Sequence, residues 1–352
     1  MKILFVGDLN EYGRSFQRYR SLKELGHEVM GLSHVPVSAE AGSEKKERFF
    51  HRVAWRLGFP SDVTRVNEKI KEAATEGKFD VIWIEKGNTI KPKTLKFLKD
   101  FKPLPKIVSC SEDDMFAKHN RSIYYTKGLP YYDVVFTTKT YNLEELKTLG
   151  ARRTELFLDS YDEKTHHPVS LTADEMKVFG SDVCFVGTFE KERAESMLFL
   201  ARNGVAITVW GNGWGNWVSK DPGLDIKNKP VYSRDYAKAI CGAKINLCFL
   251  RKINRDEVTS RSVEISACGG FMLAERTKRH LDFFKEGKEA EFFGSDEELL
   301  EKTKKYLASE AERKKISEAG RLRCIEGGYS TKKQLSQMID KIKKILMLPP
   351  FF

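Results

Sequence analysis

The sequence predicts an α/β protein of two doubly wound domains, each built on a parallel sheet covered by helices. The chain opens with an apolar run at 2–7 that ends in glycine, followed by a helical pattern and a second apolar run. Strand, glycine loop, helix and strand are the opening of a doubly wound sheet. The same alternation restarts at residue 182, after a stretch without clear periodicity at 159–180. At 352 residues the chain is long enough for two ordinary domains.

The first domain is expected to span residues 1–165. Its strands are expected at 2–7, 26–32, 79–84, 106–109, 133–138 and 153–158, and its helices at 13–25, 45–57, 63–76, 91–102 and 142–149. The strands are short apolar runs, whereas the helices carry apolar residues at spacings of three and four. The loop at 7–15 is not Gly-X-Gly-X-X-Gly, so the dinucleotide-binding fingerprint is absent.

The second domain is expected at 175–330. Its strands are expected at 182–187, 206–210, 244–250 and 271–274, and its helices at 188–203, 235–242, 260–268 and through most of the chain after 295. Residues 331–346 form a long basic amphipathic pattern. We expect this C-terminal helix, within 331–352, to pack back on the first domain and brace the interface between the domains.

Composition narrows the function classes. A hydrophobic share of 41% and a charged share of 32% describe a globular chain. No apolar run approaches the roughly 20 residues of a membrane span, and the opening run is too short for a secretory leader. The six cysteines are scattered without a Cys-X-X-Cys pair, which is typical of buried thiols in a reducing cytoplasm. We therefore expect a cytoplasmic protein.

The net charge of +11 is spread along the chain. Solvated helix faces explain most of it, but it also favours an anionic substrate, an anionic acceptor or a peripheral membrane contact. No motif of a dedicated nucleic-acid-binding module is present.

The stretch at 260–275 carries the strongest functional signal. It reads as a short helix with Ser260 or Ser262 as its cap, a glycine turn and a buried strand. A helix start favours an anion, and Glu264 lies one turn inside the helix. A phosphate at the helix start and a carboxylate one turn along would suit a nucleoside diphosphate, with the ribose diol on Glu264. An ordinary capped crossover with a solvated glutamate is the equally weighted alternative.

Polar residues also gather where the strands of the first domain end. Gly13 and Arg14 follow the first strand, Lys86 follows the third, and Asp113 and Asp114 follow the fourth. Because parallel strands end at one sheet edge, we expect these residues to lie together there. The aspartates would position an acceptor hydroxyl or act as a base, unless they only cap the next helix.

Two further patterns concern metals. The pair at 166–167 is His-His, but adjacent histidines on an extended segment point to opposite sides, so we expect a structural role. No Asp-X-Asp occurs anywhere in the chain. We therefore expect no metal site and no cofactor.

Several segments together resemble a known group of enzymes. They are Cys184-Phe-Val-Gly-Thr188 with Arg193, Asp133-Val-Val-Phe-Thr-Thr-Lys139, Asn142-Leu-Glu-Glu-Leu146, Asp113-Asp114, and Ser262-Val-Glu-Ile-Ser-Ala-Cys-Gly-Gly270. This pattern resembles the GT-B glycosyltransferases, and within them the CgeB-like branch of the group 1 glycosyltransferases. The resemblance implies the GT-B fold, two Rossmann-like doubly wound domains that face a central cleft.

The resemblance also assigns roles. It implies a nucleotide-sugar donor, with a UDP-sugar favoured, in the C-terminal domain and a variable acceptor in the N-terminal one. Glu264 would hold the donor ribose and Ser260, Arg261 and Ser262 the diphosphate. The remaining donor residues would be Gly187, Arg193, Gly211, Asn212, Gly213, Arg251 and Asp256. Asp256 stands eight residues before Glu264, where retaining members of the group commonly have glutamate, and Lys191 and Arg193 lie near their usual Arg and Lys pair.

The expected function is a metal-independent and retaining glycosyltransferase of the hexosyltransferase type. Asp113, Asp114 and Arg193 are the expected catalytic residues, and Gly13, Arg14 and Lys86 would line the acceptor side. The acceptor itself, which could be a glycan, a lipid-linked group, a protein or a nucleic acid, is not specified by the sequence. Two alternatives stay open: a nucleotide-sugar epimerase, and a non-catalytic GT-B-like protein that binds a sugar or a surface.

Overall fold

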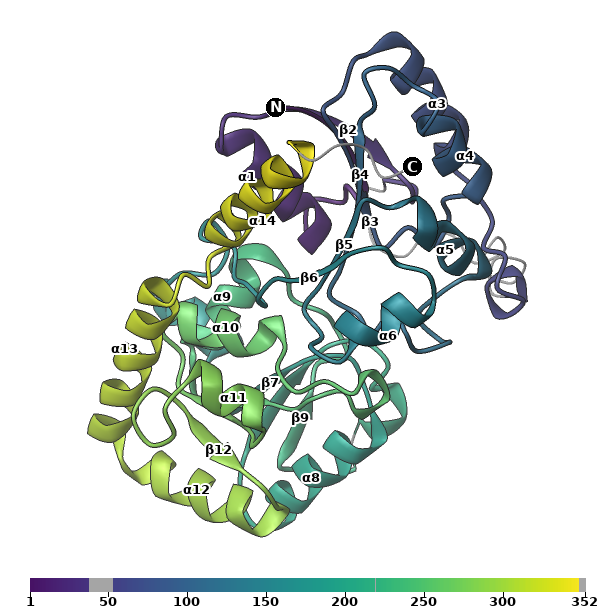
Figure 1. Cartoon of the computed structure of the whole chain (residues 1–352). Helices are drawn as coiled ribbons and strands as arrows, with labels where there is room; N and C mark the ends of the chain where they lie inside the picture. The colour runs from purple at the N-terminus through teal and green to yellow at the C-terminus, as the bar shows by residue number, and fades with distance from the viewer. Residues whose placement is uncertain (38–52, 219, 348–352) are drawn as a thin grey trace. The chain divides into compact units, whose positions relative to one another are not determined.

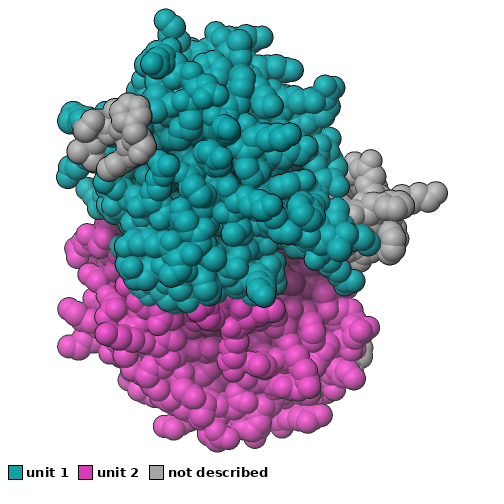
Figure 2. Space-filling view, turned by 45° about the vertical axis from the view of Figure 1, so that its right-hand side comes forward, with its two compact units in different colours: residues 1–158, 331–352 teal, residues 159–330 magenta. Residues whose placement is uncertain are grey.

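Two six-stranded parallel sheets organise the chain in the computed structural model (Figure 1). One lies in unit 1, Met1–Leu158 with Thr331–Phe352, and the other in unit 2, Asp159–Ser330, which Figure 2 distinguishes by colour. The structure describes residues 1–37, 53–218 and 220–347, so the expected helix at 45–57 lies largely outside the described residues. Residues 159–165, expected in the first domain, belong to unit 2.

Unit 1 has the strand order β2-β1-β3-β4-β5-β6, so the winding direction reverses between β1 and β3. The strands are β1 (Lys2–Gly7), β2 (Glu28–Ser33), β3 (Val81–Glu85), β4 (Lys106–Ser111), β5 (Val134–Thr137) and β6 (Thr154–Leu156). The helices are α1 (Arg14–Glu24), α3 (Val66–Glu76), α4 (Pro92–Leu98), α5 (Ile123–Gly128), α6 (Asn142–Thr148) and α14 (Thr331–Leu346), with a 3₁₀ turn η1 (Leu129–Tyr131).

Helix α14 is part of the core of unit 1. Its buried stripe, which includes Leu335, Met338 and Ile342, packs with Phe5 and Trp83 of the sheet. This stripe recurs at three- and four-residue spacing, which explains why a chain end far away in sequence adds a helix to this sheet. On the opposite face, α3 and α4 contribute to a second apolar cluster.

Unit 2 has the order β12-β11-β10-β7-β8-β9, and its winding reverses between β7 and β10. The strands are β7 (Ser181–Val186), β8 (Ile207–Trp210), β9 (Leu224–Ile226), β10 (Ala243–Cys248), β11 (Met272–Glu275) and β12 (Glu291–Phe293). The helices are α7 (Ala173–Phe179), α8 (Lys191–Arg202), α9 (Ser233–Cys241), α10 (Ser260–Ala267), α11 (Lys278–Phe283), α12 (Asp296–Ala308) and α13 (Glu310–Glu326), with 3₁₀ turns η2 (Gly215–Trp217) and η3 (Lys252–Asn254).

Among the strands and α-helices of unit 2, four were not expected from the sequence: α7, α11, β9 and β12. Helix α7 lies in the stretch at 159–180 that lacks clear periodicity, yet it has a full capping box between Thr172 and Glu175. The Thr-X-X-Glu spacing is a sequence signal of a helix start and could have revealed it. The two strands have only three residues each, which is too short to show an alternation.

None of the described helices is both long and apolar enough to cross a membrane.

Candidate functional site

Helix α10 begins at the carboxyl edge of the unit 2 sheet, after the loop that follows β10. Its N-cap is Thr259, whose side chain makes no capping hydrogen bond. The expected cap by Ser260 or Ser262 is therefore wrong. The Ser260 hydroxyl donates instead to Asp159 Oδ1 at 3.1 Å, and Ser262 is buried. Because the Thr259 side chain leaves the helix start uncapped, its first N–H groups suit an anionic ligand.

The buried Ser262 is tied to helix α11. Its Oγ lies 2.7 Å from His280 Nε2, while His280 Nδ1 lies 2.7 Å from the carbonyl oxygen of Glu275. A carbonyl only accepts, so Nδ1 carries the proton and Nε2 accepts from the serine hydroxyl. Burial lowers the pKa of His280 to about 4, so the ring is neutral at pH 7. This hydrogen-bonded chain anchors the first turn of α10.

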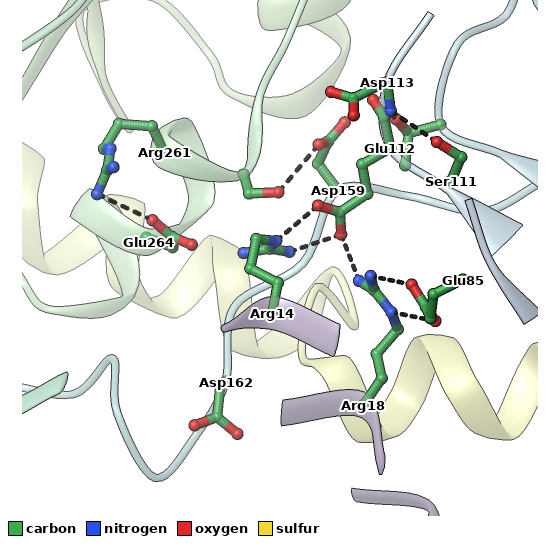
Figure 3. Close-up of polar contacts among 12 residues, drawn as sticks. Arg14, Arg18, Glu85, Ser111, Glu112, Asp113, Asp159, Asp162, Arg261 and Glu264 are labelled. Carbon is green, nitrogen blue, oxygen red and sulfur yellow. Dashed lines mark hydrogen bonds and ion pairs between the residues drawn. The ribbon is translucent and has the colours of Figure 1, made fainter. Parts of the chain in front are cut away.

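Glu264 is the centre of a buried polar cluster, the Glu264 cluster, formed by Glu264, Arg261, His166 and Tyr236. Its side chain is only 8% exposed. Arg261 Nη1 lies 3.2 Å from Glu264 Oε2 (Figure 3), and His166 Nε2 lies 3.8 Å from Oε1. Burial alone would lower the pKa of Arg261, but Tyr236 and Glu264 raise it overall. The alternative of a solvated glutamate therefore does not apply.

Two arginines meet a single carboxylate at the ends of β7 and β10. Glu190 Oε1 contacts Arg193 Nη2 at 2.9 Å and Arg251 Nε at 2.7 Å. Arg193 is buried against the ring of Phe185, and burial lowers its pKa while Glu190 partly restores it. Its Nε is buried with no hydrogen-bond partner among the described residues. The structure thus brings together the two arginines expected on the donor side.

The donor-side glycines have a structural explanation. Gly211 has φ +152°, and a Cβ there would lie 1.9 Å from the carbonyl oxygen of Gly187, so only glycine fits. That same carbonyl accepts a hydrogen bond from the Trp214 indole at 2.9 Å. Gly213 has φ +86° and is exposed beside Asn212.

Asp256 lies in the loop between β10 and α10. It follows Arg255, which has a left-handed backbone with φ +51°. Its backbone N–H donates to the carbonyl oxygen of Arg251 at 3.2 Å. This loop therefore carries both the expected Asp256 and the Arg251 of the arginine pair.

In unit 1, two arginines of α1 form ion pairs with carboxylates at the ends of β3 and β4. Arg14 donates to both oxygens of Glu112, at 2.6 and 2.8 Å. Arg18 donates to the same Glu112 at 2.6 Å and to Glu85 at 2.6 and 2.9 Å (Figure 3). Burial alone would raise the pKa of Glu112, but the two arginines hold it well below its usual range. Arg14 is therefore engaged with a carboxylate of its own unit.

The other acceptor-side residues lie at the same edge. Lys86 Nζ is 2.5 Å from Asp113 Oδ2, and Lys86 has a left-handed backbone with φ +57°. Gly13 is the N-cap of α1. Asp114 is fully buried, and its Oδ1 accepts from the N–H groups of the following turn and from Asn142. Asp114 thus holds the turn after β4 and does not cap the next helix, α5, whose N-cap is Ser122, so the capping alternative is wrong for Asp114. Asp113 remains partly exposed.

Sequence reasoning missed several partners of the expected residues: Arg18, Glu85 and Glu112 in unit 1, and Asp159, His166, Glu190 and His280 in unit 2. Glu112 stands in the acidic run after β4, and Glu85 ends an apolar strand, so their positions were visible. The sequence did not indicate which cation each carboxylate would contact, because the cations come from other elements of the fold.

The described residues contain no group of three or more His, Cys, Asp or Glu side chains placed to hold a metal ion. The anion-binding features of unit 2 are instead cationic side chains and a helix start. These can bind a phosphate ester through charge and N–H groups.

Comparison with known proteins identifies the fold. Residues 193–340 match the family model described as glycosyl transferase-like. No curated protein matches the sequence. Similar solved structures include a sucrose-phosphate synthase from Thermosynechococcus elongatus (TM-score 0.69, 12% identity, covering 98% of this chain and 99% of that one). Others are Anabaena HepE in complex with UDP-glucose (0.64, 11%, 98% and 100%) and a glycosyltransferase from Rickettsia africae (0.65, 15%, 99% and 99%). The chain therefore has the GT-B fold.

Proposed function

We propose that this chain is a glycosyltransferase that moves a sugar from a UDP-sugar to an acceptor hydroxyl. The observation that carries the proposal is the buried Glu264, one turn inside a helix whose N-cap, Thr259, makes no capping hydrogen bond with its side chain. It lies within residues 193–340, which match the glycosyl transferase-like model. The fold shared with HepE in complex with UDP-glucose supports the choice of donor. Within this family we propose the CgeB-like branch.

Donor binding would divide between two groups of residues. The ribose hydroxyls would donate to Glu264, while the diphosphate would accept from the first N–H groups of α10 near Ser260 and Arg261. Arg193 and Arg251 would supply positive charge as the leaving diphosphate gains negative charge. Because these cations can neutralise the diphosphate in place of a divalent metal ion, we propose a metal-independent reaction.

Asp113 is the proposed acceptor residue, because its partly exposed carboxylate can accept from a hydroxyl and so position it. Three cations at this edge, Arg14, Arg18 and Lys86, are each paired with a carboxylate of the same unit. This edge therefore suits a neutral hydroxylated acceptor group better than an anionic one. We propose a retaining reaction, in which the donor phosphate itself can take the acceptor proton.

A thermal-shift screen with UDP, GDP, ADP, CMP and their sugars tests the donor assignment. UDP and a UDP-sugar should raise the melting temperature, and hydrolysis of that UDP-sugar should persist in EDTA. Failure of every nucleotide to bind would contradict the proposal. Tight binding without transfer or hydrolysis would instead favour the non-catalytic alternative, and interconversion of donor sugars would favour the epimerase.

A further inference from the structure

We infer that His166 is a positioning residue that holds the Glu264 carboxylate in the orientation needed for a ribose diol. The inference rests on the proposed function and adds a residue to the same donor site. His166 lies in the segment before α7, far from α10 in sequence, and its side chain is buried. His166 Nε2 lies 3.8 Å from Oε1 of Glu264, and Arg261 Nη1 lies 3.2 Å from Oε2.

A tight turn fixes both the direction and the tautomer of the His166 ring. The backbone N–H of Asp162 donates to His166 Nδ1 at 3.0 Å, and the backbone N–H of His166 donates to the Asp162 carbonyl at 2.7 Å. An amide N–H cannot accept, so Nδ1 must carry the lone pair. The proton of the neutral ring is therefore on Nε2, the nitrogen that faces Glu264.

Tyr236 supports both partners of the carboxylate. The His166 ring meets the Tyr236 ring edge to face, with centroids 5.3 Å apart at 83°. The Arg261 guanidinium lies 4.5 Å from the centre of the same tyrosine ring. Because Glu264 is held at both oxygens, it presents its lone pairs in fixed directions, as two neighbouring hydroxyls require.

The contact of His166 with Glu264 is electrostatic, since 3.8 Å exceeds a hydrogen-bond distance. The side chains are 5% and 8% exposed, so the Nε2–H dipole acts on the carboxylate with little screening by water. We expect the loss of this contact between a dipole and a charge to weaken binding about fivefold, which corresponds to about 1 kcal/mol.

Two isosteric variants separate this role from simple support of the turn. His166→Asn keeps an acceptor where Nδ1 stands, and so keeps the bond from Asp162, but it removes the group that faces Glu264. His166→Gln does the reverse, because its amide nitrogen can take the place of Nε2. His167→Asn is the matched control, since His167 is adjacent and exposed. Calorimetry of the full chain would measure the affinity of each protein for UDP and for 2′,3′-dideoxy-UDP.

We expect His166→Asn to weaken UDP binding about fivefold, and His166→Gln and His167→Asn to bind UDP like the wild type. Dideoxy-UDP, which lacks the diol, should bind His166→Asn and the wild type equally. Equal losses for both nucleotides, or a larger loss in His166→Gln than in His166→Asn, would overturn the positioning role. If the wild type binds UDP but His166→Asn binds it unchanged, only this inference fails. If the wild type binds no nucleotide, the proposed function fails with it.

Discussion

Acidification should destabilise unit 2 through His280, whose neutral ring holds Ser262 at the start of α10. Burial lowers its folded-state pKa from 6.5 to about 4. The unfolded chain therefore binds a proton at higher pH than the folded chain does, so the free energy of unfolding falls as the pH falls. The contribution of neutral His280 is fully present above about pH 6.5 and is lost as the pH drops through about 4. This difference in pKa corresponds to about 3 kcal/mol of unfolding free energy. The free energy of unfolding should therefore fall by up to ~1.4 kcal/mol per pH unit in this range.

Urea unfolding between pH 7.5 and 4.5 measures this slope. His280→Asn is the informative comparison, because its amide can still donate to the Glu275 carbonyl but does not titrate. The variant should be less stable at pH 7.5, since it leaves Ser262 without its acceptor, yet lose less stability on acidification than the wild type. Identical pH slopes in the two proteins would refute the assignment of a buried neutral histidine. The difference between the proteins isolates His280 from His27 and His34, whose pKa values are also lowered, mainly by burial.

The remaining predictions concern the site. Glu264→Gln should weaken UDP binding by about 10- to 150-fold, the range for a charge-assisted hydrogen bond, and unchanged affinity in calorimetry would contradict the ribose assignment. Asp113→Asn should lower transfer without changing the melting temperature, whereas Asp114→Ala should lower the melting temperature, at a cost of about 1–3 kcal/mol, because buried donors of the turn and of Asn142 lose their acceptor; the opposite pattern would reverse the two roles. Arg193→Gln should reduce the transfer rate by about 10²-fold, while Arg202→Gln, an exposed arginine on the same helix, should not. Equal rates in those two variants would exclude Arg193 from the chemistry.

Much of the fold could be predicted because each sheet is parallel. Parallel strands buried on both faces read as continuous apolar runs, as in Lys2–Gly7 and Ser181–Val186, and glycines mark where several of them end. The short strands Leu224–Ile226 and Glu291–Phe293 could not be found in this way. Glu291 is a charged residue in a strand, and it is buried because Lys302 pairs with it at 2.7 Å. That partner is on α12, so the strand depends on a contact the local sequence does not show.

The positions of the site residues after strand ends could be predicted from the sequence, but the residues that contact them could not. The position of Glu264 one turn inside a helix follows from local sequence, since a Thr-Ser start and a following Gly-Gly bound the helix. Its burial does not follow, because it depends on His166 and Tyr236, which come from two other segments. The serine caps failed for the same reason. Ser260 and Ser262 found partners in Asp159 and His280, which compete with the helix start for the same hydroxyl groups.

The energetics of the Glu264 cluster point to ligand binding rather than to stability. Burying a carboxylate and a guanidinium removes both from water, and the attraction between them commonly only offsets that cost. Apolar residues of similar volume would stabilise the fold at least as well. The cluster also lies at the start of α10, where the Thr259 side chain makes no capping hydrogen bond. The first backbone N–H groups of the helix therefore need acceptors as well. A ligand with a diol for Glu264 and a phosphate for the helix start satisfies both demands at once, and a nucleoside diphosphate carries these two groups side by side.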